Sequence, residues 1–428
     1  MNLIIHHGTH NIGGSCVEIQ SQDTRIILDI GIPLEEKGKK FDFKKYKGLP
    51  GPRLVIKKIL PCVKGLYKWD ESSKSVNAIL ISHSHLDHYG FLPYVNPDIP
   101  VYASEGCKEL LKIAHLFGQC AYDPKNVKVV PPEKYFDVGD LAIMPYKVDH
   151  SAPDAFAYKV KGGGKKVFYS GDFRGHGKKK DLFEQILKDP PKNIDALIME
   201  GTTIERKDES AESEQDVEDR LVRLFKDKKQ LVIFSCSHQN IDRLTVLYNA
   251  CLKTGRTMVM IPYTAYILNK LEILSKKLPQ SGKSDIRIFF ESTTNTKKVK
   301  RDKEFWAKIG KAKISYEGIA KDIGNMVVLD SKFVRERFAA KGFLAKAFLV
   351  YSLWEGYLEN AGKFWDEHGV HIEKIHSSGH ASVAELKEFV KALDPAMIIP
   401  IHTTNPEKFQ ELFGEKVMVL SDGQRVGL

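Results

Sequence analysis

Short apolar runs separated by glycine and proline dominate the first 200 residues of the chain. Runs of strand length and β-branched character occur at 3–7, 15–20, 24–31, 75–82, 165–172 and 194–203. Apolar positions at helical spacing are confined to short segments such as 105–118. This pattern predicts a layered α/β domain.

The pattern changes after Thr203. A charged stretch at 205–220 contains almost no apolar residue, and it could form either a solvated helix or a loop. Strands and helices then alternate again, at 230–237, 238–254, 258–263 and 265–278. This alternation predicts a small parallel-sheet domain of its own. Near the end of the sequence, 381–393 has helical spacing and 396–402 has strand character.

Composition refines this picture in three ways. A length of 428 residues favours two domains, and 42% apolar with 28% charged residues is ordinary for globular proteins. No apolar run approaches the ~20 residues that span a bilayer, and no secretory leader is visible, so we expect no membrane partner. Six scattered cysteines without a CxxC pair predict a reduced, cytoplasmic protein.

The net charge of +10 favours polyanionic partners, of which nucleic acid is the commonest in cytosol. Lysines alternate with aromatic residues at 36–48 and 296–314, as on a surface that follows phosphates. Solvated helix faces or loops would explain these two segments equally well.

Four candidate metal ligands lie within six residues, directly after the apolar run 75–82: His83, His85, Asp87 and His88. Such a cluster would be costly to hold together at a strand end without a cation among its members. Imidazole and carboxylate together suit Zn²⁺ or Mn²⁺. Because no cysteine lies nearby, a catalytic site that keeps a position for water is favoured over a closed structural site.

This HxHxDH sequence after an apolar strand resembles the signature of the metallo-β-lactamase fold. Three further motifs of that family have matches in the expected order: Asp29 after an early strand, His150, and Asp172 before a glycine-rich sequence. The resemblance implies an α/β fold, the metallo-β-lactamase αββα sandwich.

One branch of that family, the β-CASP group, carries an inserted domain, and its added motifs match Glu200, His380 and His402. The sequence around His380 is similar to the form found in ribonuclease J. The resemblance covers essentially the whole chain, and it implies a catalytic domain at 1–203 and 370–428 with a parallel-sheet α/β insert at 204–369. Ribonuclease J has PxHGE after the last motif, whereas this chain has Pro400-Ile401-His402-Thr403-Thr404.

The resemblance also implies roles for these residues. The first metal ion would be held by His83, His85 and His150, the second by Asp87, His88 and His402, with Asp172 as the bridge. Asp29 would orient a ligand histidine. Two Zn²⁺ ions, with Mn²⁺ as the alternative, would generate a hydroxide that attacks a phosphodiester.

Asp87, Glu200 and His380 are the implied catalytic residues. His380 would act as hydrogen-bond donor or general acid, with Glu200 as its partner. A purely structural pair that closes the seam between domains is the alternative for Glu200 and His380. Histidines outside the motifs have no assigned role: His115, His176, His368 and His371 are expected at the surface.

Ser235, His238, Ser378 and Gly379 could form a pocket for a terminal 5′-phosphate, as in ribonuclease J-like enzymes, although an ordinary loop of small residues would look the same. The implied function is hydrolysis of single-stranded RNA, as a 5′→3′ exonuclease, an endonuclease or both.

Two other functions remain open. A DNA nuclease of the same family is the first, but its branch typically has valine at the position of His402, which favours RNA. A small-molecule hydrolase is the second, and the long insert argues against it. The oligomeric state is left open by the sequence.

Overall fold

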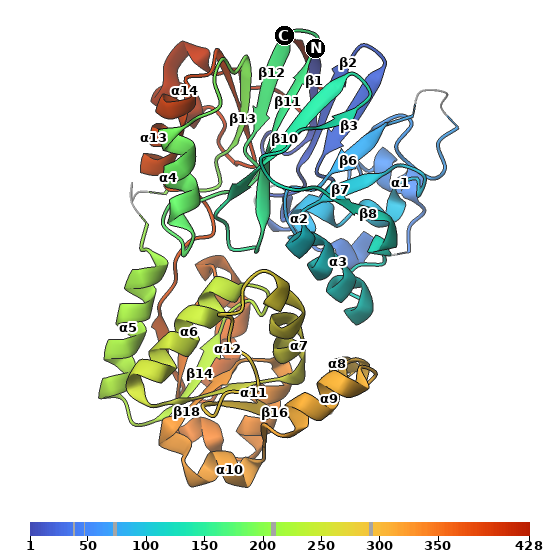
Figure 1. Cartoon of the computed structure of the whole chain (residues 1–428). Helices are drawn as coiled ribbons and strands as arrows, with labels where there is room; N and C mark the ends of the chain where they lie inside the picture. The colour runs from blue at the N-terminus through green and yellow to red at the C-terminus, as the bar shows by residue number, and fades with distance from the viewer. Residues whose placement is uncertain (37–38, 47, 72–74, 207–210, 291–293) are drawn as a thin grey trace. The chain divides into compact units, whose positions relative to one another are not determined.

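The structure is a computed structural model, and it describes residues 1–36, 39–46, 48–71, 75–206, 211–290 and 294–428. The chain forms two compact units (Figure 1). The first comprises Met1–Gly175, Lys179–Ser210 and Gly379–Leu428, and the second comprises His176–Lys178 and Ala211–Ser378. Among the described residues, no helix is both long enough and apolar enough to cross a bilayer.

Two β-sheets pack face to face in the first unit. One has the strand order β22 (Arg425–Gly427), β1 (Asn2–His7), β2 (Cys16–Ser21), β3 (Thr24–Leu28), β6 (Ala78–Leu80), β7 (Val101–Ala103), β8 (Val127–Val129). The other has the order β21 (Met397–Ile401), β13 (Ala196–Glu200), β12 (Lys165–Tyr169), β11 (Ala155–Gly162), β10 (Leu141–Val148), β9 (Phe136–Val138). A short ribbon of β4 (Glu35–Glu36) and β5 (Lys39–Lys40) lies apart from both sheets.

The strands of the second sheet are packed against apolar side chains on both of their faces. Ala196 and Ile198 of β13 point into the core between the sheets, whereas Leu197 and Met199 point to the outer face. Because both faces are buried, the strand reads as one continuous apolar run in the sequence.

Helices cover the two outer faces of the sandwich. On one side lie α1 (Gly51–Ile56), α2 (Leu86–Tyr89) and α3 (Glu105–Phe117), and on the other lie α4 (Lys180–Lys188), α13 (Val383–Leu393) and α14 (Lys408–Phe413). Leu111 of α3 packs in the first outer core, and Phe389 of α13 packs in the second. These four layers confirm the predicted αββα sandwich.

Local sequence explains where these helices begin and end. The side chain of Ser104 accepts a hydrogen bond from the backbone of Cys107 and caps α3, which stops at Gly118 in a left-handed conformation. Ser382 and Glu385 form a capping box at the start of α13. That cap fixes the backbone immediately after His380.

The second unit contains one sheet in the order β17 (Lys313–Ile314), β16 (Ile286–Phe289), β15 (Thr257–Met260), β18 (Met326–Leu329), β14 (Leu231–Ser235), β19 (Ala347–Tyr351), β20 (His371–Lys374). All of its neighbouring strands are parallel. Every residue of β14 and β19 is buried, as in a sheet that is covered on both faces. The predicted parallel-sheet insert is therefore confirmed.

The helices of this unit are α5 (Glu214–Asp227), α6 (Ile241–Thr254), α7 (Pro262–Lys270), α8 (Thr294–Val299), α9 (Lys303–Gly310), α10 (Tyr316–Lys321), α11 (Lys332–Ala340) and α12 (Leu358–Glu367). Helix α7 starts before the predicted 265–278 segment because Pro262 suits a first helical turn, and it gives way to a 3₁₀ turn after Lys270.

Helix α5 occupies the second half of the charged stretch 205–220, whereas 207–210 lie outside the described residues. Ser213 caps the helix in a capping box with Asp216. Glu214 is fully buried, and its Oε2 lies 3.0 Å from Nε of the equally buried Arg243. The described second half of the stretch therefore enters a helix, and it contributes one member of a buried ion pair.

Candidate metal centre

The motif residues lie at the carboxyl ends of strands in the first unit. Asp29 follows β3, His83 follows β6, His150 follows β10, Asp172 follows β12, Glu200 ends β13 and His402 follows β21. The backbone of Asp29 and of His402 turns into the left-handed region there, with φ of 59° and 54°. The sheets thus bring side chains from distant parts of the sequence to one place.

Asp29 is fully buried and anchors the loop that carries the HxHxDH sequence. Its Oδ1 accepts a hydrogen bond from the backbone of Ser82 at 2.7 Å, and its Oδ2 accepts from the hydroxyls of Ser82 and Tyr169 at 2.6 and 2.7 Å. Nδ1 of His88 lies 2.8 Å from the same Oδ2. This contact directs the other ring nitrogen of His88, Nε2, toward the cluster.

Gly31 allows the same loop to lie directly against the backbone after β3. A Cβ atom at Gly31 would lie 1.5 Å from the carbonyl oxygen of Asp87, so a larger residue cannot occupy this position without moving the loop. The backbone nitrogen of Ile30 also donates to the carbonyl of His88 at 2.8 Å.

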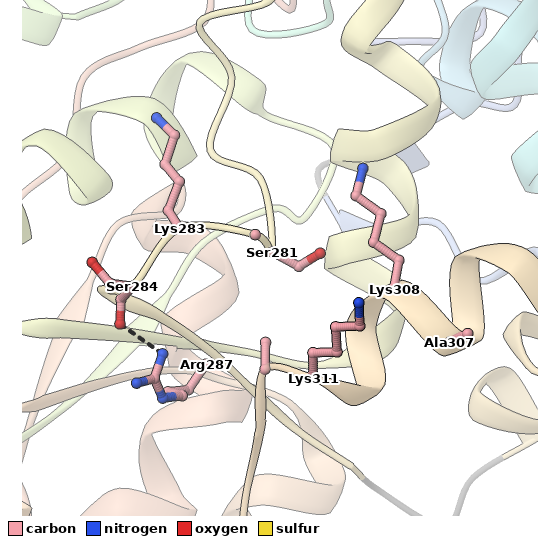
Figure 2. A pocket seen from close by; sticks show the side chains of 9 residues that line it. Ser281, Lys283, Ser284, Arg287, Ala307, Lys308 and Lys311 are labelled. Carbon is pink, nitrogen blue, oxygen red and sulfur yellow. Dashed lines mark hydrogen bonds between the residues drawn. The ribbon is translucent and has the colours of Figure 1, made fainter.

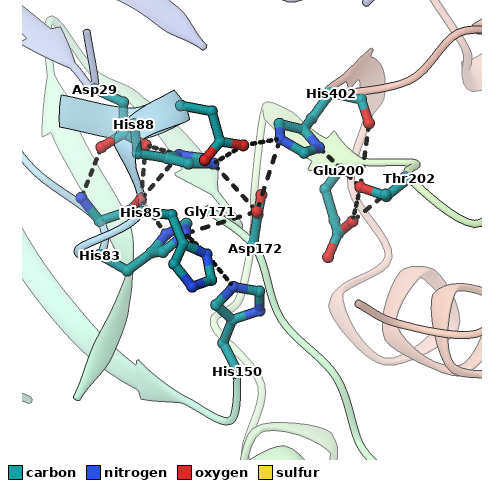
Figure 3. Close-up of polar contacts among 12 residues, drawn as sticks. Asp29, His83, His85, His88, His150, Gly171, Asp172, Glu200, Thr202 and His402 are labelled. Atoms are coloured by element: carbon teal, nitrogen blue, oxygen red, sulfur yellow. Dashed lines mark hydrogen bonds and ion pairs between the residues drawn. The ribbon is translucent and has the colours of Figure 1, made fainter. Parts of the chain in front are cut away.

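Three histidines form a first group of candidate ligands (Figure 3). Nδ1 of His85 lies 3.1 Å from Nε2 of His83 and 3.2 Å from Nε2 of His150. Burial holds the pKa of His83 and of His150 well below its usual value, and it lowers the pKa of His85 to about 4. Neutral imidazole is the form that binds metal.

Asp87, His88, Asp172 and His402 form a second group, with ligand atoms within 4.8 Å of one another. Nε2 of His88 lies 3.1 Å from Oδ2 of Asp172, yet within the described part of the chain these two buried atoms have no hydrogen-bond partner of suitable geometry. Buried polar atoms without a partner are costly, so this pair fits a cation placed between them. The nitrogen and oxygen donors of both groups suit Zn²⁺ or Mn²⁺.

Asp172 connects the two groups. Its Oδ2 lies 3.8 Å from Nε2 of His83 in the first group and 3.8 Å from Nε2 of His402 in the second. The carboxylates around His88 also attract positive charge. Burial opposes the protonation of His88, but the carboxylates of Asp172, Asp29 and Asp87 together raise its pKa well above the usual value. A divalent cation would satisfy the same attraction.

Glu200, Thr202 and His380 lie beside the second group. Oε2 of Glu200 lies 3.0 Å from Nδ1 of His380 and accepts a hydrogen bond from the Thr202 hydroxyl at 2.6 Å. Burial opposes protonation of His380, but the carboxylates of Glu200 and Asp172 raise its pKa above the usual value. The structure thus brings the predicted pair Glu200 and His380 together.

The four residues predicted to bind a 5′-phosphate are divided between the units. Gly379 belongs to the first unit, where its carbonyl oxygen lies 2.5 Å from Nδ1 of His150. Ser235, His238 and Ser378 belong to the second. Nδ1 of His238 lies 2.7 Å from the hydroxyl of Thr264. Their common pocket stays a prediction.

Two results differ from the sequence analysis. The expectation that His176 lies at the surface is wrong: its side chain is buried, and its Nε2 lies 3.1 Å from the carbonyl oxygen of Ser378. The contacts of Ser82, Tyr169 and Thr202 with the site were also missed. Ser82 and Thr202 are close in sequence to the motif residues His83 and Glu200. This proximity was the only feature of the sequence from which their contacts with the site could have been predicted.

Two family profiles match the chain. A "Beta-lactamase superfamily domain" matches residues 65–232, and a "Zn-dependent metallo-hydrolase RNA specificity domain" matches residues 370–419. The second profile and the two groups of candidate ligands together support metal binding.

Curated relatives match most of the chain at low identity. Ribonuclease J of Mycoplasma genitalium is 23% identical, and the match covers 92% of this chain and 66% of that protein. Ribonuclease J 2 of Streptococcus pyogenes is also 23% identical, over 65% of this chain and 49% of that protein. The chain therefore spans about two thirds or less of the length of these relatives.

A solved structure has the same fold. A protein of unknown function from Enterococcus faecalis V583 superposes with a TM-score of 0.80 at 20% sequence identity, over 100% of this chain and 99% of that chain. The ligand motifs, the two profiles and the relatives agree, and together they support a metallo-β-lactamase, β-CASP, ribonuclease J-like family for this chain.

Proposed function

We propose that this protein is a metal-dependent ribonuclease that hydrolyses phosphodiester bonds in single-stranded RNA. The position of Asp172 carries the proposal, because its Oδ2 lies within 4 Å of ligand nitrogens in both histidine-containing groups. Two cations held by these groups would activate water and neutralise the charge that develops on the phosphate. The names of the relatives and the RNA specificity profile support RNA as the polymer.

We assign the ligands as the family pattern implies. His83, His85 and His150 hold the first ion, Asp87, His88 and His402 hold the second, and Asp172 contacts both. Two Zn²⁺ ions are our assignment, and Mn²⁺ is the alternative because it accepts the same donors. Asp29 acts through His88, whose Nδ1 it engages.

His380 is the residue we assign to proton transfer, with Glu200 as its partner. Nδ1 of His380 faces Glu200 at 3.0 Å, so Nε2 is directed away from that carboxylate. About 20% of the His380 side chain is exposed, whereas Asp172 is almost fully buried. A protonated and accessible imidazole can donate to the oxygen that leaves the phosphate.

We further propose that Ser235, His238, Ser378 and Gly379 bind the 5′-phosphate of the strand, which would permit 5′→3′ trimming beside internal cleavage. We place the protein in the cytoplasm because all six cysteines are free. A DNA nuclease is the second candidate, and His402 at the position where the DNA branch has valine favours RNA.

One single-stranded RNA with a labelled 3′ end tests the proposal. It is prepared with a 5′-monophosphate or with a 5′-hydroxyl, and each form is incubated with Zn²⁺- or Mn²⁺-loaded protein beside the matching DNA. We expect cleavage of RNA that is abolished in an Asp87→Ala variant. Nucleotide release that depends on the 5′-monophosphate would support the end-binding pocket, and internal fragments that do not depend on it would support endonuclease action. Degradation of DNA with intact RNA would overturn the assignment to RNA.

A further inference from the structure

A cavity of about 460 Å³ in the second unit is lined by four cationic side chains and, among the described residues, by no acidic one (Figure 2). Lys283 comes from the segment that leads into β16 and Arg287 from β16 itself, whereas Lys308 lies near the end of α9 and Lys311 directly follows that helix. The hydroxyl group of Ser281 adds a neutral donor to the wall. Two segments that are separate in the sequence, one around β16 and one at the end of α9, thus contribute positive charge to the lining of the same cavity.

No ion pair with a described residue balances these four charges. Nη1 of Arg287 donates to the carbonyl oxygens of Ser284 and Ile286, at 2.6 and 3.1 Å, which fixes the guanidinium without neutralising it. Nζ of Lys283 lies over the ring of Tyr248, 4.8 Å from its centroid. Like charges gathered without a counter-charge raise the local potential, and a bound anion would relieve their repulsion.

The described acidic residues nearest along the sequence are Asp285, Asp302 and Glu304, and none of them lines the cavity. Asp285 does not line the cavity, and its carboxylate accepts a hydrogen bond from the Tyr248 hydroxyl. Asp302 caps α9 and lies 3.0 Å from Nζ of Lys270. The lining therefore presents an excess of positive charge to an incoming ligand, with Glu304 one turn before Lys308 on α9 as the nearest described carboxylate along that helix.

The charge continues beyond the cavity, which favours a polymer over a small anion. The segment 294–314 contains eight lysine and arginine residues against two acidic ones. The ring of Trp306 in this segment meets the ring of Phe290 edge to face at 4.9 Å, and Nζ of Lys300 lies 6.0 Å from the Trp306 centroid. Lysines interleaved with aromatic rings are typical of surfaces that follow a single nucleic-acid strand.

We propose that this cavity binds a backbone phosphate of the RNA strand, as a binding site built entirely from the second unit. Its volume accommodates a nucleotide-sized group. The inference rests on the proposed function, since the ligand is the same polymer. The inference adds that affinity for RNA depends on Lys308 and Lys311. These lysines belong to the second unit, whereas all the candidate metal ligands belong to the first.

A charge-matched pair of variants tests this site. Lys308→Gln combined with Lys311→Gln removes two charges from the cavity, and Lys226→Gln combined with Lys332→Gln removes two charges from exposed positions of α5 and α11 in the same unit. The probe is a single-stranded RNA of about 20 nucleotides with phosphorothioate linkages, which keep the charge and resist hydrolysis. Binding to the metal-loaded protein is followed by fluorescence anisotropy over a range of salt concentrations.

We expect the cavity variant to bind about tenfold more weakly at low salt. Its slope of log Kd against log salt should fall by about 0.7 for each phosphate that the protein no longer neutralises. The α5–α11 control should keep the wild-type slope, as should Lys308→Arg combined with Lys311→Arg. Equal reductions of affinity in the cavity variant and the control would overturn the proposal.

A second result would also overturn it. If inorganic phosphate occupies the cavity while RNA binds identically to the variant and the wild type, the cavity is a small-anion site. If only the inference is wrong, the cavity variant should cleave unmodified RNA at the wild-type rate. If the proposed function is wrong, the wild-type protein itself should not cleave RNA.

Discussion

The hydroxyl of Thr202 lies 2.8 Å from Nδ1 of His402 while it donates its proton to Oε2 of Glu200 at 2.6 Å. A hydroxyl group has one proton, so its oxygen accepts the Nδ1–H of His402. In the neutral imidazole, Nε2 of His402, which lies 3.2 Å from Oδ2 of Asp87, is then the nitrogen without a proton. Through Thr202, the carboxylate of Glu200 thus selects the tautomer in which His402 can bind a cation.

Replacement of Thr202 by valine tests this link, because valine keeps the shape of threonine and removes the hydroxyl. We expect metal affinity to fall by about 10- to 100-fold, as when a group that orients a ligand histidine is removed. Chelator competition measures the affinity. Thr202→Ser keeps the hydroxyl and should bind metal as the wild type does, and a valine variant with unchanged affinity would show that another group orients His402.

Asp29→Asn tests the anchor of His88. Asparagine tolerates the left-handed backbone found at this position, so the substitution removes the charge without adding backbone strain. We expect metal affinity to fall by about 10- to 100-fold because Nδ1 of His88 no longer faces a carboxylate. The thermal unfolding midpoint of the metal-free protein serves as control; full metal affinity in a folded Asn variant would contradict the role of Asp29.

His380→Ala separates catalysis from metal binding. We expect turnover of RNA to fall by about 10²- to 10⁴-fold, the usual contribution of a general acid, with metal content unchanged. The exposed His368, replaced by alanine, is the matched control. His380 also lies within 4.8 Å of ligand atoms of Asp172, Glu200 and His402, so a loss of metal in the variant would move His380 into the ligand set.

Glu18 gives the first unit a pH-dependent stability away from the metal centre. Burial raises its pKa, but hydrogen bonds from His6 and Arg25 outweigh this effect and lower the pKa from 4.5 to about 2. The folded state therefore binds fewer protons than the unfolded state. The stabilisation is complete above pH 4.5 and is lost as the pH falls toward 2.

Glu18→Gln should accordingly lower the free energy of unfolding at pH 7 by up to about 3 kcal/mol, and the gap to the wild type should shrink at pH values of about 4 and 3. Urea titrations at each pH measure the gap. Glu184→Gln, at an exposed position paired with Lys180, should change stability by less than about 0.5 kcal/mol. A gap that persists unchanged at the lowest pH would rule out the charged carboxylate as its cause.

The strands could be predicted from the sequence because they are apolar runs that end abruptly at polar residues. The same pattern predicted that Asp29 and His402 lie at strand ends. The order of the motifs was equally visible. The hydrogen bonds that hold the site were not, because they depend on how distant strands pair: the Tyr169 hydroxyl reaches Asp29 from β12. Composition also misleads where charges compensate one another, as with buried Glu214, whose cost of desolvation is offset by Arg243.

Strand β21 pairs in parallel with β13, so that Ile401 lies opposite Glu200, although the segment Ala211–Ser378 of the second unit lies between the two strands in the sequence. A ribosome therefore releases His402 only after the entire second unit has been made. Until then β13 has no neighbour on that side, and the second ligand group lacks one member. On the proposed function, the full set of candidate ligands is therefore complete only after the second unit has been translated.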